Sequence, residues 1–187
     1  MPAVAEPRIH PLPPAQRDER TEELLRSLRA DPDGADLNIF ATLARHPRLL
    51  KRWSAFGGIL LYGGELPGRE RELLILRTGW NCRADYEWGQ HVPIALDAGL
   101  TAEEVERVPG GPEAAGWSDQ DATLLRAADE LHDAARIGPA TWRDLAATWS
   151  ELQLIELCMV VGQYHLVAFT LNSLGVERED GVAPLPS

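Results

Sequence analysis

The sequence has few cysteines and no excess of positive charge. It contains two cysteines, Cys82 and Cys158, among 187 residues. They form no CxxC pair, which excludes a zinc knuckle or thioredoxin-type motif, and two are too few for a disulfide framework. We therefore expect a cytoplasmic protein with reduced thiols. The net charge of -11 repels phosphate backbones and anionic membrane surfaces, so we expect neither nucleic acid nor a membrane as a partner.

An uninterrupted hydrophobic run is also missing. The first twenty residues contain no apolar core of the kind found in a signal peptide. The longest apolar segment, 152–171, is long enough to span a bilayer, but polar residues interrupt it, including Glu156 and His165. Because such groups are costly in hydrocarbon, we expect a buried helix at the domain centre or in a subunit interface.

Strand-like alternation is almost absent, and apolar residues recur instead at helical spacing. The pattern predicts an all-α fold of about eight helices in one domain, 21–176. It also predicts an extended proline-rich arm at 1–20 and a loose tail at 177–187. Two predicted helices cover 67–79 and 84–98, and helix caps are expected at Thr101, Ser118, Thr141 and Ser150.

Motifs for nucleotides and metals are likewise missing. There is no GxGxxG or P-loop, and no HExxH or HxxxH spacing. His10, His46 and His132 follow no recognisable pattern. We therefore expect no metal and no organic cofactor.

One short stretch, 81–91, concentrates reactive side chains. Glu87 and His91 lie four residues apart, on one face of the predicted helix. If the preceding helix runs antiparallel, Glu72 also lies beside His91. A histidine oriented by carboxylates is suited to proton transfer near neutral pH. The alternative is a simple surface Glu–His pair.

The segment LPGRERELLILRTGWNCRADYEWGQHVPIALDAGLTAEEVERV resembles the core of the carboxymuconolactone decarboxylase family, whose superfamily includes the AhpD-like peroxidases. The likeness extends over roughly 40–178. It implies an AhpD-like helical fold and a homo-oligomer, which can be a dimer, trimer or hexamer. It also implies catalysis without a metal or organic cofactor.

The sequence departs from the peroxidase pattern at both thiols. Counted back from His91, the two cysteine positions of that pattern fall on Ala84 and Glu87, while its glutamate falls on Glu72. The resemblance therefore implies an acid–base site of Glu72, Glu87 and His91, with Tyr86 nearby. Such a site would serve decarboxylation, or a related lyase or isomerase step, on a small organic acid or lactone.

Two other functions remain open. A thiol-dependent alkyl hydroperoxide reductase would use Cys82 and requires an exposed thiol with a depressed pKa. A non-catalytic structural oligomer requires a closed pocket around His91. For either enzyme, the residues expected to contact the substrate are Trp80, Trp88, His165 and Arg83. An acidic substrate also needs a cationic anchor, for which the candidates are Arg83, Arg52 and Arg77.

Overall fold

The structure is a computed structural model that describes residues 6–29, 31 and 34–186. In this part of the chain there are nine α-helices, two 3-10 helices and no strand, so the predicted all-α class is confirmed. Residues 1–5 of the predicted arm and Ser187 of the predicted tail lie outside the described residues. The elements are η1 (Pro14–Gln16), α1 (Glu19–Arg26), α2 (Asn38–Leu43), α3 (Pro47–Tyr62), α4 (Gly68–Asn81), α5 (Asp85–Asp97), α6 (Ala102–Arg107), η2 (Val108–Gly110), α7 (Asp119–Ala134), α8 (Pro139–Ala146) and α9 (Glu151–Leu174).

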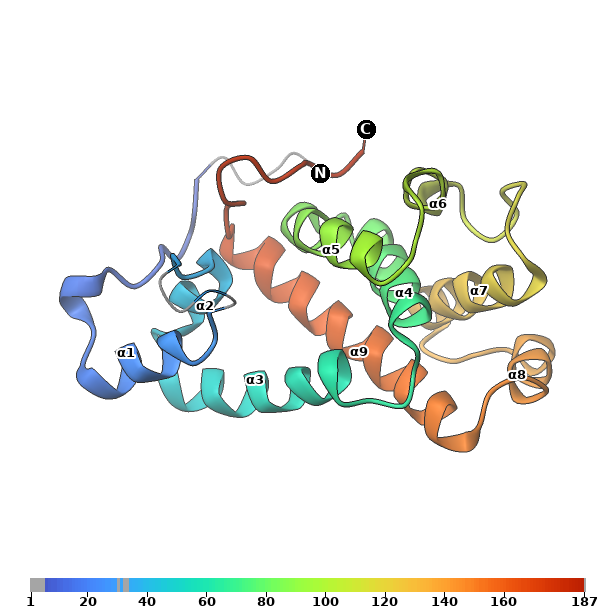
Figure 1. Ribbon diagram of the computed structural model, residues 1–187, viewed down its shortest axis with the longest axis horizontal. Coiled ribbons are helices and arrows are strands. Elements are labelled where there is room, and N and C mark those ends of the chain that lie inside the picture. The colour runs from blue at the N-terminus through green and yellow to red at the C-terminus, as the bar shows by residue number, and fades with distance from the viewer. Residues whose placement is uncertain (1–5, 30, 32–33, 187) are drawn as a thin grey trace.

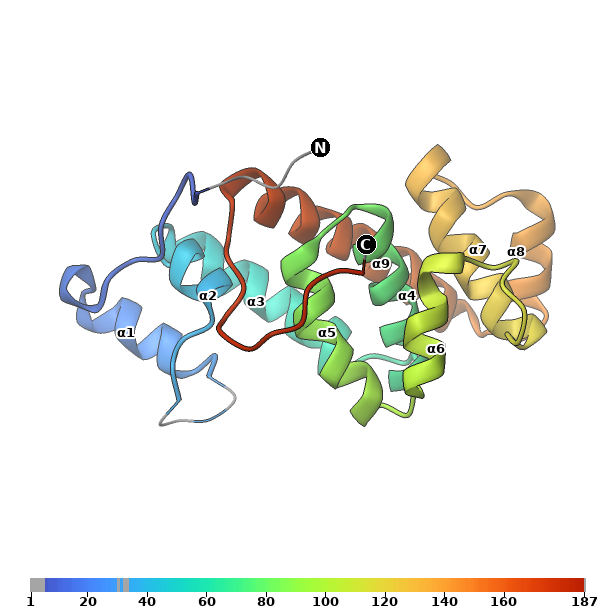
Figure 2. The same ribbon diagram turned by 90° about the horizontal axis from the view of Figure 1, so that it is seen from above.

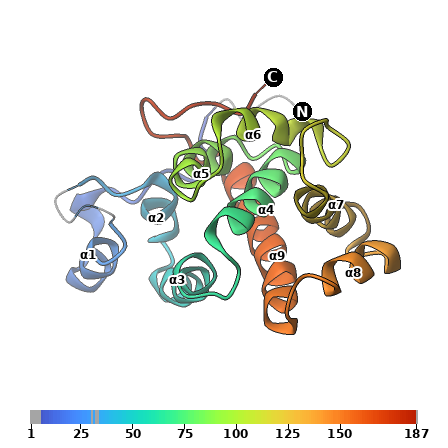
Figure 3. The same ribbon diagram turned by 45° about the vertical axis from the view of Figure 1, so that its right-hand side comes forward.

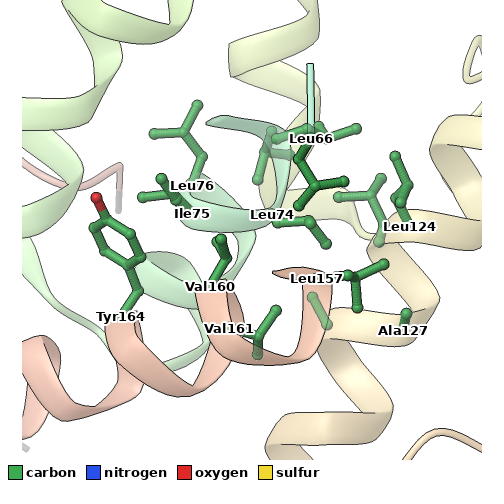
Figure 4. Packing of buried hydrophobic residues seen from close by; sticks show 14 of the residues in the cluster. Leu66, Leu74, Ile75, Leu76, Leu124, Ala127, Leu157, Val160, Val161 and Tyr164 are labelled. Carbon is green, nitrogen blue, oxygen red and sulfur yellow. The ribbon is translucent and has the colours of Figure 1, made fainter. Parts of the chain in front are cut away.

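The long helix α9 runs through the middle of the molecule, with α1–α3 on one side and α7–α8 on the other (Figure 1). Helix α4 packs along it (Figure 3), and both are central to the main hydrophobic core. Figure 4 shows Leu74 and Ile75 of α4 facing Leu157 and Val160 of α9, with Leu124 of α7 closing the cluster. Leu73, Leu74, Ile75 and Leu76 are all fully buried, which makes α4 a rigid support for the polar residues it also carries.

Helix α9 is long and apolar enough, by length and composition alone, to cross a membrane. Half of its most apolar window is nevertheless buried against the other helices. A buried core helix of a globular domain has the same composition, and the packing of α9 against α4 and α7 matches that description.

Three of the four predicted caps are confirmed. Thr101 and Ser150 each form a capping box, and the Ser118 side chain accepts a hydrogen bond from the amide of Asp121. The prediction for Thr141 is wrong. Helix α8 begins earlier, at Pro139, because proline is well suited to the first helical position, where its missing N–H is not needed. The Thr141 hydroxyl instead donates to Glu130.

Helices α4 and α5 form the hairpin that carries the predicted site. The chain reverses over 82–84, where Arg83 adopts a left-handed conformation with φ of 53°. Helix α5 ends at Asp97 and is followed by Gly99 with φ of 104°, a conformation that glycine adopts without strain. The predicted boundaries of both helices are therefore within about two residues of those observed.

The described parts of the predicted arm and tail are more ordered than the sequence predicts. The 3-10 helix η1 and the first two residues of α1 fall within the predicted arm. The C-terminal segment crosses α5 rather than hanging loose (Figure 2). Arg178 Nε donates to Asp85 Oδ2 at 2.6 Å, and the amide of Leu185 donates to Asp85 Oδ1 at 2.6 Å. The prediction of a loose tail was wrong because Asp85, at the start of α5, binds two points of that segment.

Candidate active site

The centre of the site is a hydrogen bond between the two helices of the hairpin. Glu72 Oε2 lies 2.8 Å from His91 Nδ1, as the antiparallel arrangement predicts. The Glu72 side chain is fully buried, and its other oxygen, Oε1, accepts from Arg71 Nε at 3.0 Å. Both oxygens of this buried carboxylate are therefore satisfied, which a buried charge requires.

This contact determines which ring nitrogen of His91 carries a proton. Because a carboxylate only accepts hydrogen bonds, Nδ1 carries a proton and Nε2 is free to accept or donate one. His91 is 8% exposed, and Nε2 has no hydrogen-bond partner among the described residues. Although Nε2 has no such partner, it is not fully enclosed by protein atoms. Nε2 is thus the atom available to a substrate.

Tyr164 of α9 covers the imidazole. The rings of Tyr164 and His91 meet edge to face, with centroids 4.8 Å apart and planes at 89°. Burial, with Glu72 and Glu87 nearby, raises the pKa of the Tyr164 phenol well above its ordinary value. The hydroxyl therefore stays protonated and can act as a hydrogen-bond donor next to His91.

Glu87 does not form the predicted pair with His91. Both of its carboxyl oxygens are buried and have no partner among the described residues. Burial raises the pKa of Glu87 well above its ordinary value, because an isolated charge is strongly disfavoured in an apolar interior. The residue is therefore a neutral carboxylic acid, and spacing alone did not reveal this because two residues four apart can still point to different neighbours.

The arginine at the site, Arg71, was not predicted from the sequence. Arg71 precedes Glu72 directly, and adjacent helical residues do not normally face each other, so spacing gave no signal. The three arginines proposed instead lie elsewhere. Arg52 is exposed on α3, and Arg77 is held by Asp129 and two backbone carbonyls. Arg83 is exposed and stacks over the ring of Trp80 at 4.3 Å.

Three aromatic residues assigned to catalysis or substrate binding have structural contacts instead. The Tyr86 hydroxyl accepts from the amide of Ile39 at 3.3 Å and donates to Glu179 at 2.8 Å. Trp88 is 3% exposed within the main core, and Trp80 packs against it edge to face at 6.2 Å. They join α5 to the core, to α2 and to the C-terminal segment.

Cys82 and His165 lie together, at a second position. Cys82 caps the C-terminus of α4, and its Sγ is 3.9 Å from Nδ1 of His132 on α7. His132 Nδ1 in turn lies 2.9 Å from Nε2 of His165 on α9. The sequence does not indicate that these residues meet, because they come from three separate segments, with 50 positions between Cys82 and His132 and 33 between His132 and His165.

The thiol at Cys82 does not have the properties expected of a peroxidatic cysteine. It is half-buried, and burial raises its pKa to about 12. A reactive cysteine requires a lowered pKa. The condition for thiol-dependent peroxide reduction, an exposed thiol with a lowered pKa, is therefore not met.

Two surface hollows lie away from the Glu72–His91 pair. One is formed by residues around η1, α1 and 35–41, and the other by α7 and α8. Neither is lined by Glu72, Glu87 or His91. These two hollows therefore give no access to His91.

Comparison with known protein families gives a match for the segment that contains this site. Residues 47–130 match the model of the carboxymuconolactone decarboxylase family, a range that includes Glu72, Glu87 and His91. No curated protein matches the sequence.

Several solved structures share the fold. A peroxidase-related protein with an alkylhydroperoxidase AhpD core from Ralstonia eutropha JMP134 is 19% identical, with a TM-score of 0.78, over 97% of this chain and 100% of the other. A peroxidase-related protein from Silicibacter sp. TM1040 is 17% identical, with a TM-score of 0.74, over 96% and 93%.

The debrominase Bmp8, solved as a variant in complex with 2,3,4-tribromopyrrole, is 14% identical, with a TM-score of 0.78, over 94% of each chain. At these identities the similarity establishes the fold, and the reactions remain those of the other proteins. Segment 47–130 is therefore similar to the carboxymuconolactone decarboxylase family, and the chain has the AhpD-like all-helical fold.

Proposed function

We propose that this protein is an acid–base enzyme that acts on a small organic acid or lactone without a metal or organic cofactor at this site. The reaction is decarboxylation or a related lyase or isomerase step. The observation that carries the proposal is the 2.8 Å contact between the fully buried Glu72 carboxylate and Nδ1 of His91. A buried carboxylate that fixes one imidazole nitrogen leaves the other oriented for proton transfer.

The chemistry requires a substrate carboxylate whose carbon–carbon bond can break toward a conjugated carbonyl or lactone. The electron pair of that bond passes into an enolate, and the carboxylate leaves as carbon dioxide. Nε2 of protonated His91 then donates a proton to the carbanionic carbon, and the imidazole is reprotonated from solvent. Glu72 keeps Nδ1 protonated throughout and stabilises the imidazolium.

Arg71 is positioned to hold the anionic group of the substrate. Its Nε donates to Glu72, while its two Nη atoms make no hydrogen bond with the described residues. A guanidinium presents a fork of donors that matches a carboxylate. The Tyr164 hydroxyl, which stays protonated, would donate to the carbonyl oxygen on which the enolate charge develops.

Neutral Glu87, one turn before His91 on α5, would supply an uncharged surrounding for the site. A carboxylic acid kept protonated by burial is a recurring device in acid–base sites. Its role here is a proposal, because the carboxyl group makes no hydrogen bond with His91.

A second candidate function is thiol chemistry at Cys82, and the 3.9 Å approach of Sγ to His132 favours it. A cysteine beside a histidine is the arrangement of an activated nucleophile. The pKa of about 12 argues in the other direction, so we place this function second. A non-catalytic oligomer is the third candidate, and the extensive burial of His91 supports it.

We also propose that the protein is a cytoplasmic homo-oligomer. Both cysteines are free, which suits a reducing compartment. On α9, exposed apolar side chains recur three, four and seven positions apart along one face, as in a helix that packs against a partner. They are Leu152, Ile155, Met159, Leu166 and Phe169. Ile155→Glu should reduce the mass measured by light scattering, and an unchanged mass would exclude this face.

The decisive experiment screens carboxy-lactones and keto acids for carbon dioxide release by the wild type. For any substrate found, we expect His91→Ala to lower kcat by about 10²–10⁴-fold. Glu72→Gln should lower kcat as well, because the amide no longer fixes the tautomer of His91. His46→Ala is the matched control, since His46 is exposed and precedes α3, away from the site.

The alternatives give different results. Turnover that survives in His91→Ala would refute the acid–base proposal. Hydroperoxide reduction that requires a dithiol and disappears in Cys82→Ser would identify the second function. No turnover and no binding of any screened acid would favour the third.

A further inference from the structure

The cluster around Cys82 brings three metal-ligand types together outside the Glu72–His91 pair. Cys82 Sγ, His132 Nδ1 and His165 Nε2 all lie within 4.8 Å of one another. They come from the end of α4, from α7 and from α9. Cys82 lies ten residues beyond Glu72 on α4, about 15 Å along the helix axis at 1.5 Å per residue. The cluster is therefore separate from the proposed acid–base site.

The backbone sets the tautomer of His165. Its Nδ1 lies 2.8 Å from the carbonyl oxygen of Val161, one turn earlier in α9. A carbonyl only accepts, so Nδ1 carries the proton and the lone pair of neutral His165 is on Nε2. That lone pair points at His132. A histidine whose second nitrogen donates to a backbone carbonyl is the usual arrangement of a metal ligand.

Cys82 is also held in place. Asn172 Nδ2 donates to the carbonyl oxygen of Cys82 at 2.9 Å, which ties the end of α4 to α9. His132 is exposed, while Cys82 and His165 are half-buried. Two ligands are therefore positioned by the fold, and the third can close over an ion from the solvent side.

The distances suit a tetrahedral ion after shifts of the ligand side chains. With zinc–sulfur bonds of about 2.3 Å and zinc–nitrogen bonds of about 2.0–2.1 Å, tetrahedral angles require an S···N separation of about 3.6 Å and an N···N separation of about 3.3 Å. The observed separations are 3.9 Å from Cys82 to His132 and 2.9 Å between the two histidines. These two separations need to change by a few tenths of an ångström, and the third, from Cys82 Sγ to His165 Nε2, lies within 4.8 Å and needs to shorten by up to about 1.2 Å.

We propose that Cys82, His132 and His165 bind one zinc ion and leave a fourth position open to water or an exogenous ligand. One thiolate and two imidazoles favour zinc over the oxygen-seeking ions magnesium and calcium. Binding replaces the thiol proton of Cys82 with the metal and releases that proton to solvent. The ion links α4, α7 and α9, so it also stabilises the fold. The sequence predicts no metal because these ligands form no local motif.

The test is a titration of the chelator-treated full chain with cobalt(II), followed by displacement with zinc. Cobalt in a tetrahedral sulfur–nitrogen site gives visible bands and a thiolate charge-transfer band. We expect saturation at one ion per chain for the wild type. The thiolate band should disappear in Cys82→Ser, and His132→Ala and His165→Ala should each weaken binding by at least about 100-fold.

Matched controls distinguish binding at this site from nonspecific metal binding elsewhere on the protein. Cys158→Ser removes the other thiol, and His46→Ala removes an exposed histidine outside the cluster; both should bind like the wild type. His132 is exposed, so His132→Ala should fold even if His165→Ala does not, and far-UV circular dichroism checks this. Failure of the wild type to bind, binding without a thiolate band, or wild-type affinity in His132→Ala would each overturn the proposal. Because the readout is binding, its failure is distinguishable from failure of the His91 chemistry.

Discussion

The backbone of Gly79 in α4 lies directly against the carboxyl group of Glu87 in α5. A methyl group at position 79 would lie 3.2 Å from Glu87 Oε1. The hairpin therefore accommodates a buried, unpartnered acid by placing a glycine opposite it. This contact links helix packing to the electrostatics of the candidate site.

Gly79→Ala should lower the free energy of unfolding by about 1–2 kcal/mol, because the added methyl group overpacks the contact with Glu87. Gly58→Ala is the matched control. A methyl group there meets nothing within 4 Å, so the better helix propensity of alanine should stabilise the protein by about 0.5–1 kcal/mol. Urea unfolding measures both. If the loss at position 79 persists unchanged in a Glu87→Ala background, the contact is not its cause.

Glu87→Gln should change the pH dependence of stability. The folded-state pKa of Glu87 is raised above its ordinary value of 4.5, so the folded protein holds a proton that the unfolded chain loses. Below pH 4.5 both states are protonated and the variant should match the wild type. Above it, wild-type stability falls by up to about 1.4 kcal/mol per pH unit until the folded-state pKa is reached, and the variant avoids this loss.

Unfolding free energies of the wild type and of Glu87→Gln, measured at intervals from about pH 4 to about pH 8, on either side of the ordinary carboxyl pKa, test this directly. The difference should be small at the acidic end and should grow in favour of the variant as pH rises. A variant that is equally destabilised at every pH would show that Glu87 is ionised or hydrogen-bonded in the folded state.

Tyr86→Phe should affect stability rather than catalysis. The hydroxyl of Tyr86 joins the amide of Ile39 to Glu179, so its loss should reduce the free energy of unfolding by about 1–2 kcal/mol. Turnover of any substrate found for the wild type should change less than about twofold. A kcat that falls by the factor expected for general acid–base groups, about 10²-fold or more, would restore Tyr86 to the catalytic residues.

Cys82 should react slowly with thiol reagents. With a pKa of about 12, against about 8.5 for a free cysteine, its thiolate fraction at pH 8 is lower by on the order of a thousandfold. Alkylation by iodoacetamide, followed by mass spectrometry in the presence of a chelator, measures this. The unfolded protein should react at the rate of a free thiol. Rapid labelling of Cys82 in the folded protein would contradict the assigned burial and support thiol chemistry.

The polar core of the candidate site was only partly predictable. Glu72 and His91 could be paired from sequence because two helices of known direction, joined by a short loop, bring them together. The surroundings of Glu87 and Tyr86 could not be predicted, because helical spacing says which residues share a face, and not which neighbour fills the space beyond it. Arg71 and Tyr164 were missed because their contacts depend on side-chain direction and on a helix far away in the chain.

The sequence by itself determined the all-α class, most helix boundaries and caps, and the family resemblance, because these depend on local hydrogen bonding and on apolar spacing within one segment. Only the tertiary structure decided that Glu87 is a buried neutral acid, that the C-terminal segment is anchored by Asp85, and that Cys82, His132 and His165 meet. Each of these depends on how separate helices pack, since burial and long-range contacts are properties of the assembled core and not of any one segment.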